Sequence, residues 1–188
     1  MINMSSTHLE QQAIKATQYW LEHTVIGFNF CPFAKREFVR NSINYQESDT
    51  SNPEEALYQL IEVFKLLDSD STIETSLLIF SHGFSKFYDY LDLVDLANQL
   101  LEKEGYEGVY QIASFHPNYF FDGVEEDDAS NYTNRSPYPI LHILRETSLE
   151  RALTNIDNPD EIPERNIQVA QEQGSNVFEK ILEKAFHQ

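Results

Sequence analysis

A short run of large apolar residues, Leu77-Leu78-Ile79-Phe80, constrains the fold of this chain more than any other feature. The run shows no alternation of polar and apolar residues. That pattern is typical of a strand covered on both faces, as in the interior of a parallel sheet. We therefore predict that this strand is central and that helices pack against both of its faces.

Helix and strand patterns alternate along the rest of the chain. The predicted order is a helix at residues 9–27, a strand at 43–45, a helix at 53–67, a strand at 77–80, a helix at 88–105, a strand at 110–116, a helix at 137–153, and a last helix at 163–186 that Gly174 interrupts. Helices that connect successive strands favour right-handed parallel crossovers. We therefore predict one domain over residues 1–188, of the α/β class: a small sheet of three or four mainly parallel strands flanked by helices, with two C-terminal helices.

The balance of charge excludes several classes of partner. Thirty-one Asp and Glu against thirteen Lys and Arg give a formal net charge of −18. This charge repels phosphate backbones and anionic membrane surfaces, so we expect neither nucleic acid nor membrane as a partner. The sequence has no membrane-length apolar run, no signal-like start and a single cysteine, so we expect a cytoplasmic protein without an internal disulfide. Nothing in the sequence fixes an oligomeric state.

Two segments concentrate the residues that carry chemistry. The first, residues 111–117, is a predicted strand that ends in His116 and Pro117. A histidine at such a stiffened strand end is a candidate general base or ligand. The alternative is a histidine that hydrogen-bonds to the next loop.

The second segment, residues 134–146, supplies polar side chains for an anion site. The candidate binding residues are Asn134, Arg135, Ser136, His142 and Arg145. A guanidinium offers a planar fork to carboxylate or phosphate, and Arg135 precedes a predicted helix that Ser136 would cap, where backbone N–H groups favour anions. We therefore predict a pocket for a small anionic molecule. The alternative is that the arginines form ion pairs with Asp127, Asp128 or Glu146.

Cys31 is the candidate nucleophile. It is followed by Pro32-Phe33-Ala34-Lys35-Arg36, and the two cations, together with a helix start after Pro32, are expected to lower the pKa of the thiol. His116 would act as its base if the fold brings the two side chains together. The alternative is a small buried side chain among phenylalanines.

A metal site is a second interpretation of the same region. His142 and Glu146 are four residues apart, so they share one face of the predicted helix, and His116 would supply a third ligand. Three protein ligands with an open position suit hydrolysis by a metal-bound water. The sequence contains no phosphate-binding glycine loop and no dinucleotide fingerprint, so it names no cofactor.

Several of these segments resemble a known family. The matching residues are Cys31-Pro32-Phe33-Ala34, residues 75–79, residues 111–117, and residues 131–139 with His142, Arg145 and Glu146. They are similar to the bacterial family described as domain of unknown function 1415, over most of the chain. The resemblance implies a single-domain bacterial protein. It implies no activity and assigns no role to any residue.

Three hypotheses follow. The first is an anion pocket built from the two segments, with Cys31 and His116 available for catalysis. The second is a metal-dependent hydrolase that uses His116, His142 and Glu146. The third is a non-catalytic binding or structural protein. The first requires that His116 and Arg135 face each other across an open crevice.

Overall fold

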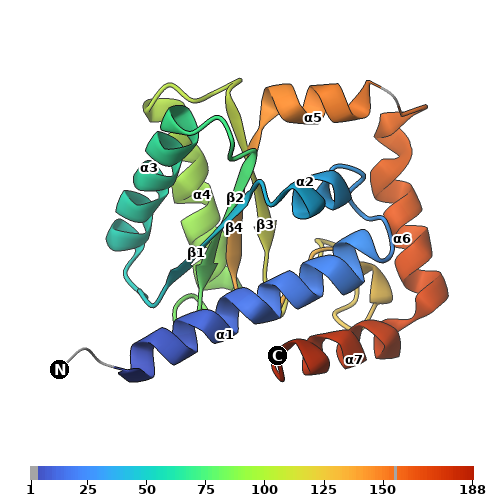
Figure 1. Ribbon diagram of the computed structural model, residues 1–188. Coiled ribbons are helices and arrows are strands. Elements are labelled where there is room, and N and C mark those ends of the chain that lie inside the picture. Colours follow the sequence, from blue (N-terminus) through green and yellow to red (C-terminus); the bar gives the residue numbers. More distant parts are fainter. Residues whose placement is uncertain (1–3, 155) are drawn as a thin grey trace.

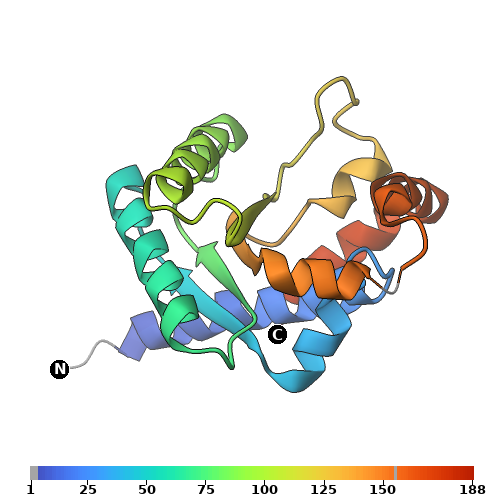
Figure 2. The same ribbon diagram turned by 90° about the horizontal axis from the view of Figure 1, so that it is seen from above.

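The protein is built on a four-stranded sheet with helices on both faces. The computed structural model describes residues 4–154 and 156–188, with side chains from residue 12 onward. The strands are β1 (Ile43–Ser48), β2 (Thr75–Phe80), β3 (Tyr110–Phe115) and β4 (Ile140–Arg145). Helices α3 (Pro53–Ser69) and α4 (Phe87–Lys103) lie on one side of the sheet, and α1 (Met4–Trp20) crosses the other (Figures 1 and 2).

The strand order is β1-β2-β4-β3. Strands β1 and β2 are parallel, while β4 runs antiparallel to both of its neighbours. The α/β class is confirmed, but the prediction of mainly parallel strands was wrong. The central position of β2 is confirmed, since it pairs on both sides and all six of its residues are buried.

Strand β4 is the element that the sequence analysis missed. Residues 137–153 were predicted as one helix, but Ile140–Arg145 is a strand and the helix α5 (Glu146–Leu153) begins only afterwards. Pro137 and Pro139 precede the strand and hold the chain extended before it. Pairing with β2 and β3 then satisfies the backbone of an apolar segment that is buried on both sides.

The remaining helices surround the face of the sheet crossed by α1. Helix α1 continues into a π-helical segment, η1, and the loop after it leads to α2. The bounds are η1 (Leu21–Ile26), α2 (Ala34–Arg40), η2 (Ala129–Thr133), η3 (Pro159–Glu161), α6 (Ile162–Gln173) and α7 (Ser175–Ala185). Gly174 separates α6 from α7 with a φ of +78°, which confirms the predicted interruption.

Each face of the sheet carries its own apolar core. On one face, Leu78 and Phe80 pack with Phe64 and Tyr90 of α3 and α4. On the other face, Leu77 and Ile79 pack with side chains of α1, η1 and α7. This alternation along β2 explains why an uninterrupted apolar run was required there.

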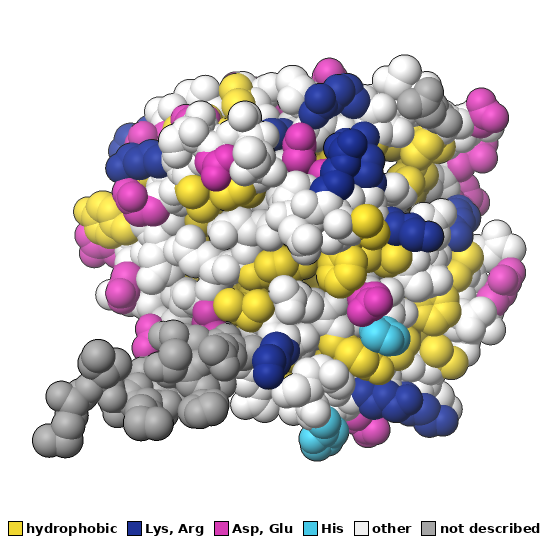
Figure 3. Space-filling view, viewed as in Figure 1, with side chains coloured by type: hydrophobic (Ala, Val, Ile, Leu, Met, Phe, Trp, Pro, Cys, Tyr) yellow, Lys and Arg dark blue, Asp and Glu magenta, His cyan; other side chains and the backbone are white. Residues whose placement is uncertain are grey.

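The surface on the α1 side is uneven in charge. Apolar side chains are visible in a band between α1 and α2, while dark blue Lys and Arg side chains gather over α2 and α5 (Figure 3). Among the described residues, no helix combines the length and apolar character needed to cross a membrane.

Candidate functional site

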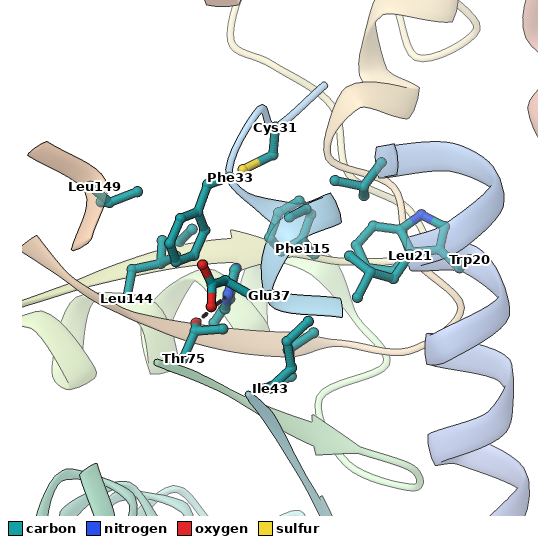
Figure 4. A pocket seen from close by; sticks show the side chains of 15 residues that line it. Trp20, Leu21, Cys31, Phe33, Glu37, Ile43, Thr75, Phe115, Leu144 and Leu149 are labelled. Atoms are coloured by element: carbon teal, nitrogen blue, oxygen red, sulfur yellow. Dashed lines mark hydrogen bonds between the residues drawn. The ribbon is translucent and has the colours of Figure 1, made fainter. Parts of the chain in front are cut away.

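A cavity of about 130 Å³ lies on the α1 side of the protein, between the sheet and the segment from η1 to α2 (Figure 4). Most of its wall is apolar and comes from α1, η1, α2, α5 and the strands. Trp20, Cys31, Glu37, Thr75 and His142 also line the cavity, but the surface that they turn toward it is apolar, and none of their nitrogen or oxygen atoms faces it. These residues are spread over the sequence, so only the folded chain brings them to one cavity.

Cys31 stands in the tight turn between η1 and α2. Asn29 adopts a left-handed conformation with a φ of +55°, and the N–H of Ala34 donates to the carbonyl oxygen of Cys31 at 3.2 Å. Burial raises the pKa of the thiol, while hydrogen bonds from the backbone of Phe33 and Ala34 oppose that rise. The expectation that nearby cations lower this pKa was wrong, because burial dominates. The thiol is therefore neutral at pH 7.

His142 lies on the floor of the cavity, paired in register with Leu77 of β2 and Ala113 of β3. Its Nε2 lies 2.7 Å from Oγ1 of Thr75, and that hydroxyl also bonds to the carbonyl oxygen of Ile143 at 2.6 Å. A carbonyl only accepts, so the hydroxyl donates to Ile143 and Nε2–H of His142 donates to Thr75. Nδ1 is then the unprotonated nitrogen. Burial lowers the pKa of His142 to about 4.

Glu37 also lines the cavity, but the residue is 0% exposed and its carboxylate does not face the space. One oxygen accepts from the hydroxyl of Ser42 at 2.6 Å, and the other accepts from Nε of Arg36 at 2.5 Å. The sequence analysis missed this residue. Its only signal was a glutamate in a short charged stretch, where exposure is the usual expectation.

His116 is on the opposite side of the sheet from His142. It is fully buried, and its ring lies 5.3 Å from Phe87 and 5.1 Å from Tyr90 of α4, measured between ring centroids. Nε2 donates to the carbonyl oxygen of Phe84, and Nδ1 accepts from the N–H of Asn118, each at 3.0 Å. Burial lowers the pKa of His116. Both ring nitrogens are therefore used in hydrogen bonds, Nε2 to the loop after β2 and Nδ1 to the loop after β3.

Arg135 lines an open groove of about 650 Å³ on another part of the surface. Its guanidinium donates to the carbonyl oxygens of Tyr119 and Glu126 at 2.9 and 2.6 Å, and it stacks 4.7 Å from the ring of Tyr132. The same groove is lined by three carboxylates, from Glu126, Asp127 and Glu179. Arg135 thus braces the acidic loop through its backbone.

The side chain of Arg145 binds to the C-terminal end of α3 and to the loop that follows. Its guanidinium donates to the carbonyl oxygens of Leu67 and Ile73, with the Nε bond to Ile73 at 3.1 Å, and lies 5.7 Å from the Tyr110 ring. A guanidinium is well suited to the unpaired carbonyls at a helix C-terminus. The group therefore ties β4 to α3.

Asn134 and Ser136 make hydrogen bonds that hold the segment between β3 and β4 in place. The side-chain amide of Asn134 donates to the carbonyl oxygen of Ser114 at 3.1 Å. Ser136 is buried and its hydroxyl donates to the carbonyl oxygen of Tyr138 at 2.5 Å. It does not cap a helix, because a strand follows.

The predicted site residues therefore divide into separate places. Cys31 and His142 share the cavity, while His116 faces α4, Arg145 faces α3, and Arg135 lines the acidic groove. His142 and Glu146 do not share a helix face, since one belongs to β4 and the other begins α5. Within residues 4–154 and 156–188, no three His, Cys, Asp or Glu side chains are grouped so as to hold a metal ion.

A second hollow adjoins the cavity. It is a surface groove of about 290 Å³. Val25, Cys31 and Phe115 line both the cavity and this groove. The outer wall of the groove comes from α6 and from the chain around Asn134. Cys31 thus belongs to the wall that the cavity shares with the surface groove.

Comparison with known proteins identifies one family. The family model described as "Protein of unknown function (DUF1415)" matches residues 12–180, a range that contains every residue of the cavity wall. Comparisons with curated proteins and with solved structures gave no match. The match covers most of the chain, and it agrees with the resemblance carried by the Cys31 and His116 segments. The chain belongs to the DUF1415 family.

Proposed function

We propose that this protein binds a small, mostly apolar molecule in the cavity between the sheet and the η1–α2 segment. The observation that carries the proposal is an apolar space inside the fold, lined by residues of α1, η1, α2, α5 and the sheet. Core packing in proteins normally leaves few voids larger than a water molecule. An apolar cavity of about 130 Å³ supports a binding role for an apolar molecule.

The size of the cavity limits the part of the ligand that it holds. An engineered apolar cavity of roughly 150 Å³ binds benzene. A space of about 130 Å³ therefore suits a ring or short chain of roughly six non-hydrogen atoms. This size favours a small metabolite, or one end of a longer molecule, over a nucleotide or a sugar.

The charge state of the wall favours an uncharged occupant. Cys31 has a raised pKa and His142 a lowered one, so both are neutral at pH 7. The carboxylate of Glu37 is held by Ser42 and Arg36. Among the described residues, no nitrogen or oxygen of the wall faces the cavity, so apolar contact would hold the occupant.

Catalysis by Cys31 is the second candidate, since His142 lines the same cavity and has an unprotonated nitrogen. A neutral imidazole can take a proton from a thiol when the two groups meet. The raised pKa of Cys31 weighs against a resting thiolate. Binding is therefore the primary proposal, and any reaction would require that the ligand itself favour the thiolate.

An anion site at Arg135 has weaker support. The guanidinium already donates to two carbonyl oxygens, and Glu126, Asp127 and Glu179 line the same groove. Three carboxylates repel an anion more than one partly engaged guanidinium attracts it.

Binding of toluene tests the proposal. We expect toluene to raise the melting temperature, because a ligand that binds only the folded state stabilises it by mass action. Ala113 of β3 lines the cavity, so Ala113→Val should fill part of the space and weaken toluene binding by at least about tenfold. The matched control is Ala152→Val, a half-buried position of α5 outside the cavity wall. No binding by the native protein, or equal binding by the Ala113→Val variant, would refute the proposal.

A further inference from the structure

The partition between the cavity and the outer groove is thin and apolar. Three residues, Val25, Cys31 and Phe115, line both spaces. The cavity and the groove therefore adjoin at these three residues, and a molecule that occupied both would pass beside Cys31.

The groove differs from the cavity in its polar groups. Thr133, Asn134 and Asn166 line it, together with apolar side chains. The Asn134 amide donates to Ser114 and accepts from Thr133, and the Asn166 amide donates to the carbonyl oxygen of Phe30 at 2.6 Å. A side-chain amide has two N–H donors and two acceptor lone pairs. The oxygen of the Asn166 amide also accepts from Arg165 at 3.0 Å, so each amide is fixed in orientation by a donor and an acceptor and keeps one N–H and one lone pair unused.

No charged side chain lines the groove among the described residues. A cation adjoins it, however: the guanidinium of Arg165 donates to Oδ1 of Asn166 at 3.0 Å and to the carbonyl oxygens of Phe28 and Asn29 at 3.2 and 2.7 Å. That guanidinium is already engaged by three oxygens, so an ionised head group in the groove would lose hydration without gaining a free partner of opposite charge. An uncharged head group that donates and accepts hydrogen bonds would match the two amides.

We propose that the ligand has two parts: an apolar ring or short chain in the cavity, and an uncharged hydrogen-bonding head, such as an amide or hydroxyl, in the groove. The two parts join beside Cys31. This inference rests on the proposed function, because it assumes that the cavity is a binding site. It adds the class of molecule and the direction from which the molecule enters.

Four probes that each contain a phenyl ring separate the contribution of the ring from that of the head group. Toluene has no head, 2-phenylacetamide has a neutral amide head, phenylacetate has an anionic head, and benzylamine has a cationic head. We expect 2-phenylacetamide to bind at least about fivefold more tightly than toluene, which corresponds to roughly one net hydrogen bond. Phenylacetate and benzylamine should bind at least about fivefold more weakly than the amide, measured by calorimetry or ligand-observed NMR.

Variants of α6 locate the head group. Asn166→Leu removes the groove amide and should reduce the advantage of 2-phenylacetamide over toluene to less than about twofold, with toluene binding unchanged. Gln168→Leu, an exposed position of the same helix outside the groove, is the matched control. If Asn166→Leu unfolds, Ile167→Trp provides a second test. Ile167 lines the groove and is 39% exposed, so a larger side chain there should narrow the groove and weaken the amide probe without disturbing the core.

The outcomes separate this inference from the proposed function. If toluene binds but the amide adds nothing, or a charged head binds as tightly, the two-part ligand is wrong and the cavity remains a binding site. If the Asn166→Leu and Gln168→Leu variants behave alike, the head does not lie in the groove. If none of the four probes binds, both proposals fail together.

Discussion

Nε2 of His142 donates a hydrogen bond to Oγ1 of Thr75 across 2.7 Å, and this bond ties β4 to β2 on the floor of the cavity. The same hydroxyl donates to the carbonyl oxygen of Ile143 at 2.6 Å. With its only proton used there, Thr75 can only accept from His142. The pair thus fixes the neutral imidazole in one tautomer and leaves Nδ1 as its basic nitrogen.

The stability of the protein should fall in mild acid because of this histidine. Its pKa is about 4 when folded and about 6.5 when unfolded, so the unfolded chain binds the proton first as the pH falls. The free energy of unfolding should be level above about pH 7 and should decline between roughly pH 6.5 and 4, by up to about 3 kcal/mol from this group. Urea unfolding at several pH values measures this decline.

His142→Asn should make that decline shallower, although His116, whose pKa is also lowered, keeps part of it. His82 is exposed, so His82→Asn is the control and should leave the decline unchanged. A His142→Asn variant whose pH dependence equals that of the native protein would contradict the assignment.

The thiol of Cys31 should react slowly. Its raised pKa keeps the thiolate fraction low, and the partition around it restricts access. At pH 8 we expect a thiol reagent to label the native protein at least about tenfold more slowly than the urea-unfolded chain. Cys31 is the only cysteine, so Cys31→Ala gives the background rate. Labelling of the native protein at the unfolded rate near pH 7 would instead favour a catalytic thiol.

Much of the fold could be predicted from local patterns, and β4 could not. Ile140, Ile143 and Leu144 fall at a spacing that fits one face of a helix. Their actual conformation depends on pairing with β2 and β3, which are distant in the sequence. Strand formation depends on such partners, so the propensities of one short segment could not predict β4.

The residues of the candidate site could be predicted only in part, because strand pairing also decides which of them meet. Cys31 and His142 were candidates, but their shared cavity depends on the register that places His142 opposite Leu77. Glu37 and Thr75 carried no motif and join the cavity only through the fold. Arg145 was expected to bind a ligand, and its guanidinium instead bonds to carbonyl oxygens at the end of α3.

Arg145 should therefore matter for stability. Arg145→Ala leaves the carbonyl oxygens of Leu67 and Ile73 without their donor, and should lower the free energy of unfolding by about 2–3 kcal/mol. Arg145→Lys should recover part of this, since an ammonium replaces the charge but not the planar fork. Denaturant titration provides the comparison, and toluene binding should persist in whichever variant folds.

The control for Arg145 is Arg151, which lies on α5 with a 63% exposed side chain and a 3.5 Å contact to Glu74. An exposed ion pair is worth at most about 1 kcal/mol, so Arg151→Ala should have a small effect. Equal losses from both substitutions would mean that Arg145 does not support α3.

The buried carboxylate of Glu37 should depend on Ser42 more than on Arg36. Ser42 is buried and its hydroxyl bonds to the carboxylate at 2.6 Å, whereas the side chain of Arg36 is 46% exposed. Ser42→Ala leaves one oxygen without a donor and should cost about 1–3 kcal/mol, measured by urea unfolding. Arg36→Ala should cost less, because water reaches that side of the pair.

Glu37→Leu separates the cost of an unpaired charge from the value of the pair. Replacing a buried charge by an apolar side chain of similar volume is often neutral, so Glu37→Leu should be less destabilising than Ser42→Ala. The surface that faces the cavity stays apolar in this variant, so toluene should bind at least as tightly as to the native protein. A Glu37→Leu variant that folds but no longer binds toluene would mean that the carboxylate maintains the shape of the cavity.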